Sequence, residues 1–286
     1  MRIGFIGAGK VGFSLGKYLS VNGMTLSGYF SRSRSSAEEA AGFTDSAVFD
    51  SPCELLKESD VIFITVPDGT ISSVFSQLKG CGISGKTICH CSGAMTANEA
   101  FGELSSLGAY GCSIHPLFPV SSRYESYKEL KDAFFCLEGD TEAVETWKEL
   151  FTGFGNPVRV ISGDTKKEYH AACAISSNLV CALAAESIGL MEKCGFSEEE
   201  ALAALSPLAV ANIKKVFSAG PVNALTGPVE RCDISTVKKH LDCLPEGPGK
   251  EMYRAVSLRL TDTAAKKHPD TDYSEMRAVL SGKDIV

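Results

Sequence analysis

A glycine-rich turn stands near the start of the chain, directly after a short apolar run and before a helical pattern. The turn reads Gly7-Ala8-Gly9-Lys10-Val11-Gly12 and has the spacing G-x-G-x-x-G. Gly7 would permit a tight turn, Gly9 would let the backbone approach a pyrophosphate, and Gly12 would let the helix pack close to the strand. The free N–H groups at the start of the helix would face the phosphates. A structural glycine turn is the alternative, but the preceding strand favours a dinucleotide-binding site.

The end of the second expected strand indicates which dinucleotide would bind. Sites specific for NAD place Asp or Glu here to hold the ribose 2′-hydroxyl. The chain instead continues Ser31-Arg32-Ser33-Arg34, without an acid that would repel a 2′-phosphate. Arg32 could pair with that phosphate and stack on adenine, while Ser31 and Ser33 could donate hydrogen bonds. The sequence therefore favours NADP over NAD, against the alternative of a solvated basic turn.

Two further turns follow expected strands and should lie at the same edge, because ligands of open α/β sheets bind outside the carboxyl ends of the strands. The first is Val66-Pro67-Asp68, which we expect beside the ribose and nicotinamide of the cofactor. The second is Ser92-Gly93, where Ser92 could bind cofactor or substrate and Gly93 would allow a close approach. Ordinary turn chemistry is the alternative for both segments.

Groups that could move a proton gather in two further places. His115 precedes Pro116 in a segment expected at the ligand edge, and histidine exchanges protons near neutral pH. Lys166 and His170 are four residues apart and would share one face of a helix, with Asn178 on the shoulder of that face. Whether Lys166 or Lys167 points inward is open. The alternatives are a packed loop histidine and a structural network at the junction of two domains.

A last cluster lies further along, where a turn at Thr226 precedes a helix and Arg231 and Asp233 follow. Thr226 and Arg231 could bind substrate, with Arg231 holding a carboxylate. A structural hinge, with Arg231 paired to Asp233, is the alternative.

Metal binding and thiol chemistry find little support. The 11 cysteines include no C-x-x-C pair, and Cys89 and Cys91 would share one face of a buried strand. Cysteine there serves as a small hydrophobe. We expect no metal site, and we expect thiols kept reduced in a cytosol.

The order of the expected elements positions these residues. Short apolar runs alternate with helical patterns, which implies βαβ units and a parallel sheet. The expected strands are Ile3–Ile6, Leu26–Phe30, Val61–Val66, Thr87–Cys91, Ala133–Leu137 and Val158–Ile161. From Gly163 onward the pattern is helical, beginning with one helix over Lys166–Cys194. We predict an α/β Rossmann fold, a doubly wound parallel sheet, at residues 1–162, followed by an all-α domain at residues 163–286.

Composition sets the broad class. The chain has 286 residues, 44% of them hydrophobic, which fits about two folded domains. Its net charge of −7 shows no surplus that would favour nucleic acid. No signal peptide is visible at the N-terminus, and polar residues interrupt the apolar stretch Ala171–Leu190, so we expect a cytoplasmic protein without a membrane span.

Seven motifs together resemble a family of uncharacterised NADP-oxidoreductase-like proteins with an N-terminal Rossmann domain and a C-terminal domain of unknown function. They are GAGKVG at 7–12, FSRS at 30–33, VPD at 66–68, CSGA at 91–94, HPLFP at 115–119, KKEYHAAC at 166–173 and ALTGPVERCD at 224–233. The second domain of that family is similar to the helical C-terminal domain of 6-phosphogluconate dehydrogenase. The resemblance implies a homodimer formed through the helical domain and an active site in an interdomain cleft.

More distant relatives suggest chemistry. Ketopantoate reductase and β-hydroxyacid dehydrogenases carry Lys-x-x-x-Asn where this chain has Lys166-x-x-x-His170. Pyrroline-5-carboxylate reductases share the overall plan. We therefore expect an NADP-dependent oxidoreductase acting on a small carbonyl, hydroxy-acid or imine compound, with His170 or Lys166 protonating the substrate and His115 as the rival acid. The alternatives are a non-catalytic NADP-binding sensor or regulator, an imine reductase, and a structural dimeric scaffold.

Overall fold

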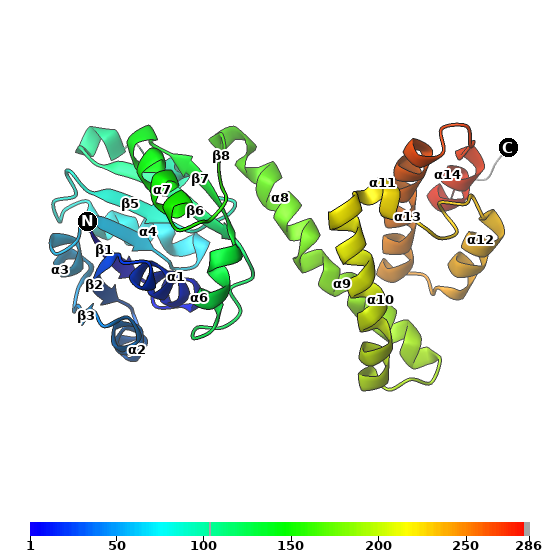
Figure 1. The fold of residues 1–286 in the computed structure, drawn as a ribbon, viewed down its shortest axis with the longest axis horizontal. Helices are drawn as coiled ribbons and strands as arrows, with labels where there is room; N and C mark the ends of the chain where they lie inside the picture. The colour runs from blue at the N-terminus through cyan, green and yellow to red at the C-terminus, as the bar shows by residue number, and fades with distance from the viewer. Residues whose placement is uncertain (103, 283–286) are drawn as a thin grey trace. The chain divides into compact units, whose positions relative to one another are not determined.

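The computed structural model describes residues 1–102 and 104–282, and the chain divides into two compact units. The first unit is Met1–Asn178 and the second is Leu179–Val286. The sheet lies in the first unit, and the elements described in the second are all helical (Figure 1). The predicted boundary, with a Rossmann domain at residues 1–162 and a helical domain at residues 163–286, stays a prediction.

One sheet of eight strands forms the centre of the first unit. Its strands in chain order are β1 (Arg2–Ile6), β2 (Thr25–Phe30), β3 (Ala47–Val48), β4 (Val61–Ile64), β5 (Thr87–His90), β6 (Tyr110–Leu117), β7 (Phe134–Gly139) and β8 (Val158–Val160). Their order in the sheet is β3-β2-β1-β4-β5-β6-β7-β8. The order reverses between β1 and β4, which is where sheets of this kind bind ligands.

The predicted Rossmann fold is confirmed, with one difference in strand direction. The strands from β3 to β6 are all parallel, as expected. β7 runs antiparallel to β6, and β8 is parallel to β7. The sheet is therefore mixed at this end.

Helices cover both faces of the sheet, because alternate residues of each strand point to opposite sides. Phe63 belongs to a core that includes residues of α1 (Lys10–Val21), α2 (Arg34–Thr44) and α7 (Thr141–Gly153). Its neighbours Ile62 and Ile64 belong to the other core, with α3 (Pro52–Lys57), α4 (Asp68–Leu78) and α5 (Ala97–Phe101). The remaining short elements of this unit are η1 (Leu104–Leu107), α6 (Ser126–Glu129), η2 (Leu130–Asp132) and η3 (Gly163–Thr165).

Strand β6 was not expected, and it carries His115. No strand was predicted in this segment, and that omission was wrong, because the structure pairs Tyr110–Leu117 with β5 on one side and β7 on the other. Pro116 explains the error, since proline donates no ladder hydrogen bond and is rare inside strands. Here Pro116 stands next to the last residue of the strand.

The single long helix expected after Gly163 is also interrupted. α8 (Lys166–Ser176) ends at Ser177, whose backbone leaves the helical region at φ −126° and ψ −73°, and α9 (Asn178–Lys193) begins directly afterwards. The Ser177 hydroxyl donates to the carbonyl of Cys173 at 2.9 Å. Such bonds from serine to the preceding turn bend helices.

Five more helices lie among the described residues of the second unit. They are α10 (Glu198–Ala219), α11 (Pro221–Ala224), α12 (Ile234–Cys243), α13 (Pro248–Lys267) and α14 (Ser274–Ser281). Residues of α12, α13 and α14 form the core of this unit, with Met276 and Val237 fully buried. The all-α character expected after Gly163 is confirmed.

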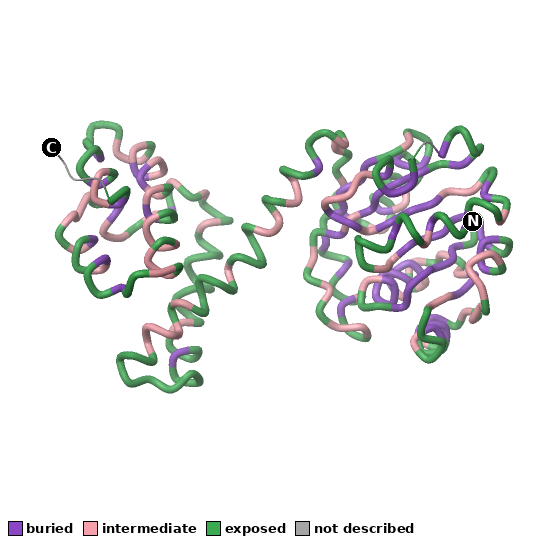
Figure 2. Tube along the Cα trace, turned by 180° about the vertical axis from the view of Figure 1, so that it is seen from behind, coloured by how far each residue is buried: buried purple, intermediate pink, exposed green. Residues whose placement is uncertain are grey.

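The helices α9 and α10 bury little of their apolar surface within the chain (Figure 2). Exposed side chains include Leu208 and Phe217, at 69% and 77% of full exposure. By length and composition alone, Gly163–Lys193 and Glu198–Ala219 could cross a membrane, which is weak evidence by itself.

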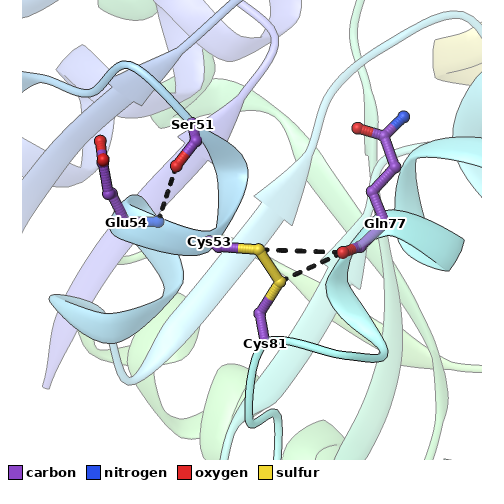
Figure 3. The surroundings of a disulfide bond; sticks show 5 residues. All are labelled: Ser51, Cys53, Glu54, Gln77 and Cys81. Carbon is purple, nitrogen blue, oxygen red and sulfur yellow. Dashed lines mark hydrogen bonds between the residues drawn. A yellow bond between two sulfur atoms is a disulfide. The ribbon is translucent and has the colours of Figure 1, made fainter.

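Two cysteines are bonded, against the expectation that all thiols are reduced. Cys53 of α3 and Cys81, shortly after α4, form a disulfide with their Cα atoms 5.3 Å apart (Figure 3). α3 and α4 contact each other, which brings together residues 28 positions apart in sequence. The other nine cysteines are free.

Candidate functional site

The glycine-rich turn has the geometry that a dinucleotide site needs. Gly7 has φ +106°, and a Cβ atom there would lie 2.8 Å from the Thr65 carbonyl oxygen. A Cβ on Gly12 would clash with the Gly7 carbonyl, so this glycine allows the close packing of α1. A Cβ on Gly9 would meet nothing within 4 Å, which leaves open space at the start of the helix. Gly9 supplies no side-chain cap, so the first N–H groups of α1 can bind an anion.

The two arginines in the turn after β2 have different surroundings. Arg34 pairs with Glu38 at 2.9 Å and also with Asp50. Ser33 is the N-cap of α2, where its hydroxyl accepts from the Ser36 N–H. Arg32 is exposed and forms no ion pair with the residues that the structure describes. Of the two arginines, Arg32 is the one whose guanidinium stays available for a phosphate.

Arg123 lies beside the glycine-rich turn and was missed by the sequence analysis. Its guanidinium donates to the Ala8 carbonyl at 2.7 Å and pairs with Glu39 at 2.7 Å. It also lies over the ring of Phe13, 5.1 Å from the centroid. No local pattern could reveal this contact, because Arg123 and Ala8 are 115 positions apart. Arg123 is therefore a residue beside the glycine-rich turn that sequence reasoning did not find.

The turns after β4 and β5 contact each other. The Ser92 hydroxyl donates to Asp68 Oδ2 at 2.6 Å and accepts from the Met95 N–H at 3.0 Å. Ser92 is buried, so its hydroxyl already has partners. Val66 and Pro67 precede Asp68, and Val66 lies against the position of a Cβ on Gly7, at 3.1 Å.

Lys166 points into the interior of the first unit, while Lys167 is exposed and pairs with Glu99 at 3.2 Å. The Lys166 ammonium donates to the Ser113 hydroxyl and lies 3.6 Å from Glu138 Oε2. Burial lowers the pKa of Lys166, and the nearby Glu138 carboxylate opposes that shift. The open choice between the two lysines is thus decided for Lys166, which forms part of a buried ion pair.

The buried ion pair is part of a longer network of hydrogen bonds. Glu138 Oε2 accepts from the Ala97 N–H at 2.9 Å, at the start of α5. On the other side, the Ser113 hydroxyl donates to the Ser92 carbonyl at 3.2 Å. The sequence analysis missed Glu138, whose partner is distant in sequence. The network connects α8 to the turn at Ser92, whose hydroxyl donates to Asp68.

Two histidines meet over Gly93. A Cβ on Gly93 would lie 3.0 Å from His115 Nε2 and would clash with His170 Cδ2. The two imidazole rings are 6.0 Å apart between centroids. Gly93 therefore allows two rings that can exchange protons to come close to it. The expected approach of a ligand to Gly93 stays a prediction.

The surroundings of His115 keep its ring neutral. Burial is the largest cause that lowers the pKa of His115 to about 4, with His170 and Lys166 adding to it and Asp68 opposing it. His115 Nδ1 lies 2.7 Å from the hydroxyl of Tyr169, a third residue that the sequence analysis missed. Tyr169 stands inside the motif KKEYHAAC, which could have pointed to it.

The other predicted residues have surroundings of their own within their units. Asn178 is exposed and ends the first unit, with its side chain bonded to the Ser177 hydroxyl at 3.1 Å. Thr226 and Arg231 are exposed residues of the second unit.

Thr226 and Arg231 belong to a motif with an evident structural role. Glu230 pairs with Lys267 at 3.1 Å and with His268 at 2.7 Å, and its carbonyl accepts from the Tyr273 hydroxyl at 2.6 Å. Asp233 caps α12 through the Thr236 N–H. The motif thereby ties together the helices of the second unit.

No group of three or more His, Cys, Asp and Glu side chains suits a metal ion among residues 1–102 and 104–282.

Comparisons with known proteins agree with the geometry. Residues 2–90 match the family described as NADP oxidoreductase coenzyme F420-dependent, and residues 133–260 match a domain of unknown function, DUF2520. No match was found among curated proteins.

Solved structures share the fold over nearly the whole chain. A protein from Thermotoga maritima is 26% identical with a TM-score of 0.73, covering 93% of this chain and 99% of its own. A candidate NADP oxidoreductase from Bacteroides fragilis is 23% identical with a TM-score of 0.69, covering 91% and 98%. An imine reductase from Myxococcus stipitatus, solved with NADP+, is 17% identical with a TM-score of 0.64, covering 99% and 95%.

These findings confirm the predicted cofactor and the predicted family resemblance, while the boundary between residues 162 and 163 stays a prediction. The chain combines an N-terminal match to an NADP oxidoreductase domain at residues 2–90 with the C-terminal domain of unknown function DUF2520 at residues 133–260, and the first match bears out the predicted NADP cofactor.

Proposed function

We propose that the protein is an NADP-dependent oxidoreductase that interconverts a small carbonyl or imine compound with the corresponding hydroxy acid, alcohol or amine. The observation that carries this proposal is the meeting of His115 and His170 over Gly93. This cluster lies at the carboxyl edge of the sheet that also carries the glycine-rich turn. Proton exchange and dinucleotide binding would thus share one edge.

The residues at this edge are proposed to have different roles in binding and catalysis. NADPH, when bound, supplies the hydride. The residues of the turn 7–12 would hold the pyrophosphate, Arg32 and Ser31 the 2′-phosphate, and the segment Val66–Asp68 would pass the ribose and nicotinamide. His170 would then protonate the substrate oxygen or nitrogen as it gains hydride. The buried contacts of Lys166 favour a supporting role for it.

Residues outside this edge complete the proposed substrate site. Asn178 would orient the substrate or the cofactor amide, and Thr226 and Arg231 would bind a polar or carboxylate group of the substrate. Their contribution requires that the helical domain, proposed as residues 163–286, approach the sheet edge. We propose that this happens in an interdomain cleft.

The helical domain is also proposed to form a homodimer in the cytoplasm. Residues of α9 and α10 expose Leu179, Leu208 and Phe217 at 53%, 69% and 77%. Covering a side chain of this size contributes about 1.5–3 kcal/mol. Large exposed apolar areas usually mark a binding face, and a second copy of the chain is the proposed partner.

A turnover screen tests the proposed function. Purified protein with NADPH is offered small 2-keto acids, 3-keto acids, cyclic imines and coenzyme F420, and cofactor oxidation is followed by absorbance. Turnover that His170→Ala lowers at least tenfold, without loss of NADPH binding, supports the proposal. NADPH binding without turnover of any compound favours the sensor, and thermal melts unaffected by NADPH favour the scaffold.

A further inference from the structure

Tyr169 and His115 form a close pair between α8 and β6. The Tyr169 hydroxyl lies 2.7 Å from His115 Nδ1, and the two rings meet edge to face with centroids 5.7 Å apart. α8 begins at Lys166, whose buried ion pair fixes the first turn of the helix against the sheet. Tyr169 lies three residues on, one turn along the same helix.

The second nitrogen of His115 faces elsewhere. Nε2 lies 3.0 Å from the position that a Cβ on Gly93 would take, and His170 Cδ2 lies closer still to that position. The imidazole ring therefore lies between the Tyr169 hydroxyl on one side and Gly93 with the His170 ring on the other.

The proton on the tyrosine has one good acceptor. Burial raises the pKa of Tyr169, so its hydroxyl stays protonated. Besides His115, the hydroxyl contacts the thiols of Cys136 and Cys173. Sulfur is a weak acceptor, whereas the nitrogen of a neutral imidazole is a strong one. The hydroxyl therefore donates to Nδ1 and can accept from a thiol.

A neutral imidazole carries one proton, so a hydrogen bond accepted at Nδ1 places the N–H at Nε2. The ring stays neutral because burial lowers the pKa of His115 to about 4, with His170 and Lys166 adding to the shift and Asp68 opposing it.

We propose that Tyr169 is a positioning residue that holds His115 as the neutral Nε2–H tautomer, aimed at a carbonyl oxygen or imine nitrogen over Gly93. His115 is then a hydrogen-bond donor to the reacting atom, and the proton for the product comes from His170. This inference rests on the proposed function only for the identity of the acceptor.

The tautomer itself can be measured without a substrate. Long-range ¹H–¹⁵N spectra of the uniformly ¹⁵N-labelled full chain report which ring nitrogen carries the proton, and His115→Gln assigns the signals. We expect the Nε2–H form at neutral pH in the wild type and a mixture of both tautomers in Tyr169→Phe. An Nδ1–H signal in the wild type, or an unchanged tautomer in the variant, overturns the proposal.

The second unit offers a matched control. His240 Nδ1 lies 2.8 Å from the hydroxyl of Tyr253, with ring centroids 5.8 Å apart, in nearly the same geometry. Tyr253→Phe should change the signals of His240 and leave those of His115 unchanged. A change at His115 in both variants would indicate a general loss of structure and would contradict the proposed specific role.

Turnover adds a second readout once a substrate is known. Removing one neutral hydrogen bond should lower kcat about three- to tenfold, with the Kd for NADPH unchanged and the pH profile of kcat altered. A protein without turnover would contradict the proposed function, while the tautomer measurement would still decide the role of Tyr169. An unchanged kcat and pH profile in Tyr169→Phe would overturn it.

Discussion

Two arginines at the end of β2 differ in what surrounds them. Arg34 is neutralised by Glu38 and Asp50, whereas Arg32 forms no ion pair with the residues that the structure describes. An arginine free of internal partners keeps its bidentate donors for a phosphate. Of the two arginines, only Arg32 should therefore contribute to a preference for NADP over NAD.

Arg32→Glu is expected to raise the Kd for NADPH at least thirtyfold and to change the Kd for NADH less than threefold, because only NADPH carries the 2′-phosphate. This is a loss of about 2 kcal/mol or more, measured by titration calorimetry. Arg34→Glu is the matched control and should leave the ratio of the two Kd values nearly unchanged. An equal loss for both cofactors in Arg32→Glu would contradict the assignment.

Two histidines, the buried His90 and the partly buried His115, should make stability depend on pH. Burial lowers the pKa of His90 to about 3 and that of His115 to about 4, from an ordinary 6.5. Because the folded pKa values are depressed, this stability is present above pH 6.5 and is lost as pH falls towards 4 and then 3. Each group steepens the loss by up to about 1.4 kcal/mol per pH unit.

Urea unfolding at a series of pH values measures this dependence, with the free energy of unfolding taken from each midpoint. His90→Leu should make the free energy of unfolding fall less steeply between pH 6 and 4, because about one proton fewer is taken up on unfolding. This change of slope is expected whatever the variant does to stability at neutral pH. A slope that stays the same in this variant would contradict a depressed pKa at His90.

At the scale of the elements, one ion pair fixes where α8 begins. Lys166 is 1% exposed and Glu138 is 8% exposed, so neither charge can be hydrated if its partner is removed. The pair also links α8 to the N–H of Ala97 in α5. Breaking a buried pair by removing one partner typically costs about 3–5 kcal/mol.

Lys166→Met should lower the free energy of unfolding of the full chain by about 3 kcal/mol or more, measured by urea denaturation. Lys167→Met removes an exposed lysine and should change it by less than about 0.5 kcal/mol. The double variant Lys166→Met, Glu138→Gln should recover part of the loss. Equal stability of the two single variants would mean that Lys166 is not held by this pair.

Elements that depend on residues close together in the sequence could be predicted from it. The glycine-rich turn, the alternation of strands and helices, and the capped helix starting at Glu198 depend on neighbours in sequence, and all are present in the structure. Strand β6 could not be predicted because Pro116 is atypical of strands. The contacts of Arg123 with Ala8 and of Tyr169 with His115 join residues more than fifty positions apart, where no spacing rule applies.

At the scale of the whole molecule, the two domains differ in how completely they bury their own apolar residues. The sheet has two cores, one on each face, and the largest side chains of the first unit, such as Trp147, are almost fully buried. The helical unit has a smaller core in α12, α13 and α14, while α10 buries only Ala201. A helix that is apolar and unburied within its own chain needs another surface to cover it.

A second copy of the chain is the proposed cover, and charge substitutions on α10 test it. Leu208 and Phe217 are both exposed, so Leu208→Lys with Phe217→Lys should leave the fold intact while placing two cations in the proposed interface. Sedimentation should give twice 30.4 kDa for the wild type and 30.4 kDa for the double variant at micromolar concentration.

Val21→Lys is the control, because Val21 is exposed at 57% on α1 of the first unit and should not affect the dimer. Flotation with liposomes tests the remaining explanation, which is that the exposed helix enters a membrane. Such a helix would carry the wild type to the top of the gradient and leave the double variant behind. A wild type that sediments as a monomer, or one that floats with lipid, contradicts the dimer. If the dimer is confirmed, the loss of turnover in the monomeric variant would then show that the active site needs both copies, because the residues over Gly93 are untouched by the substitution.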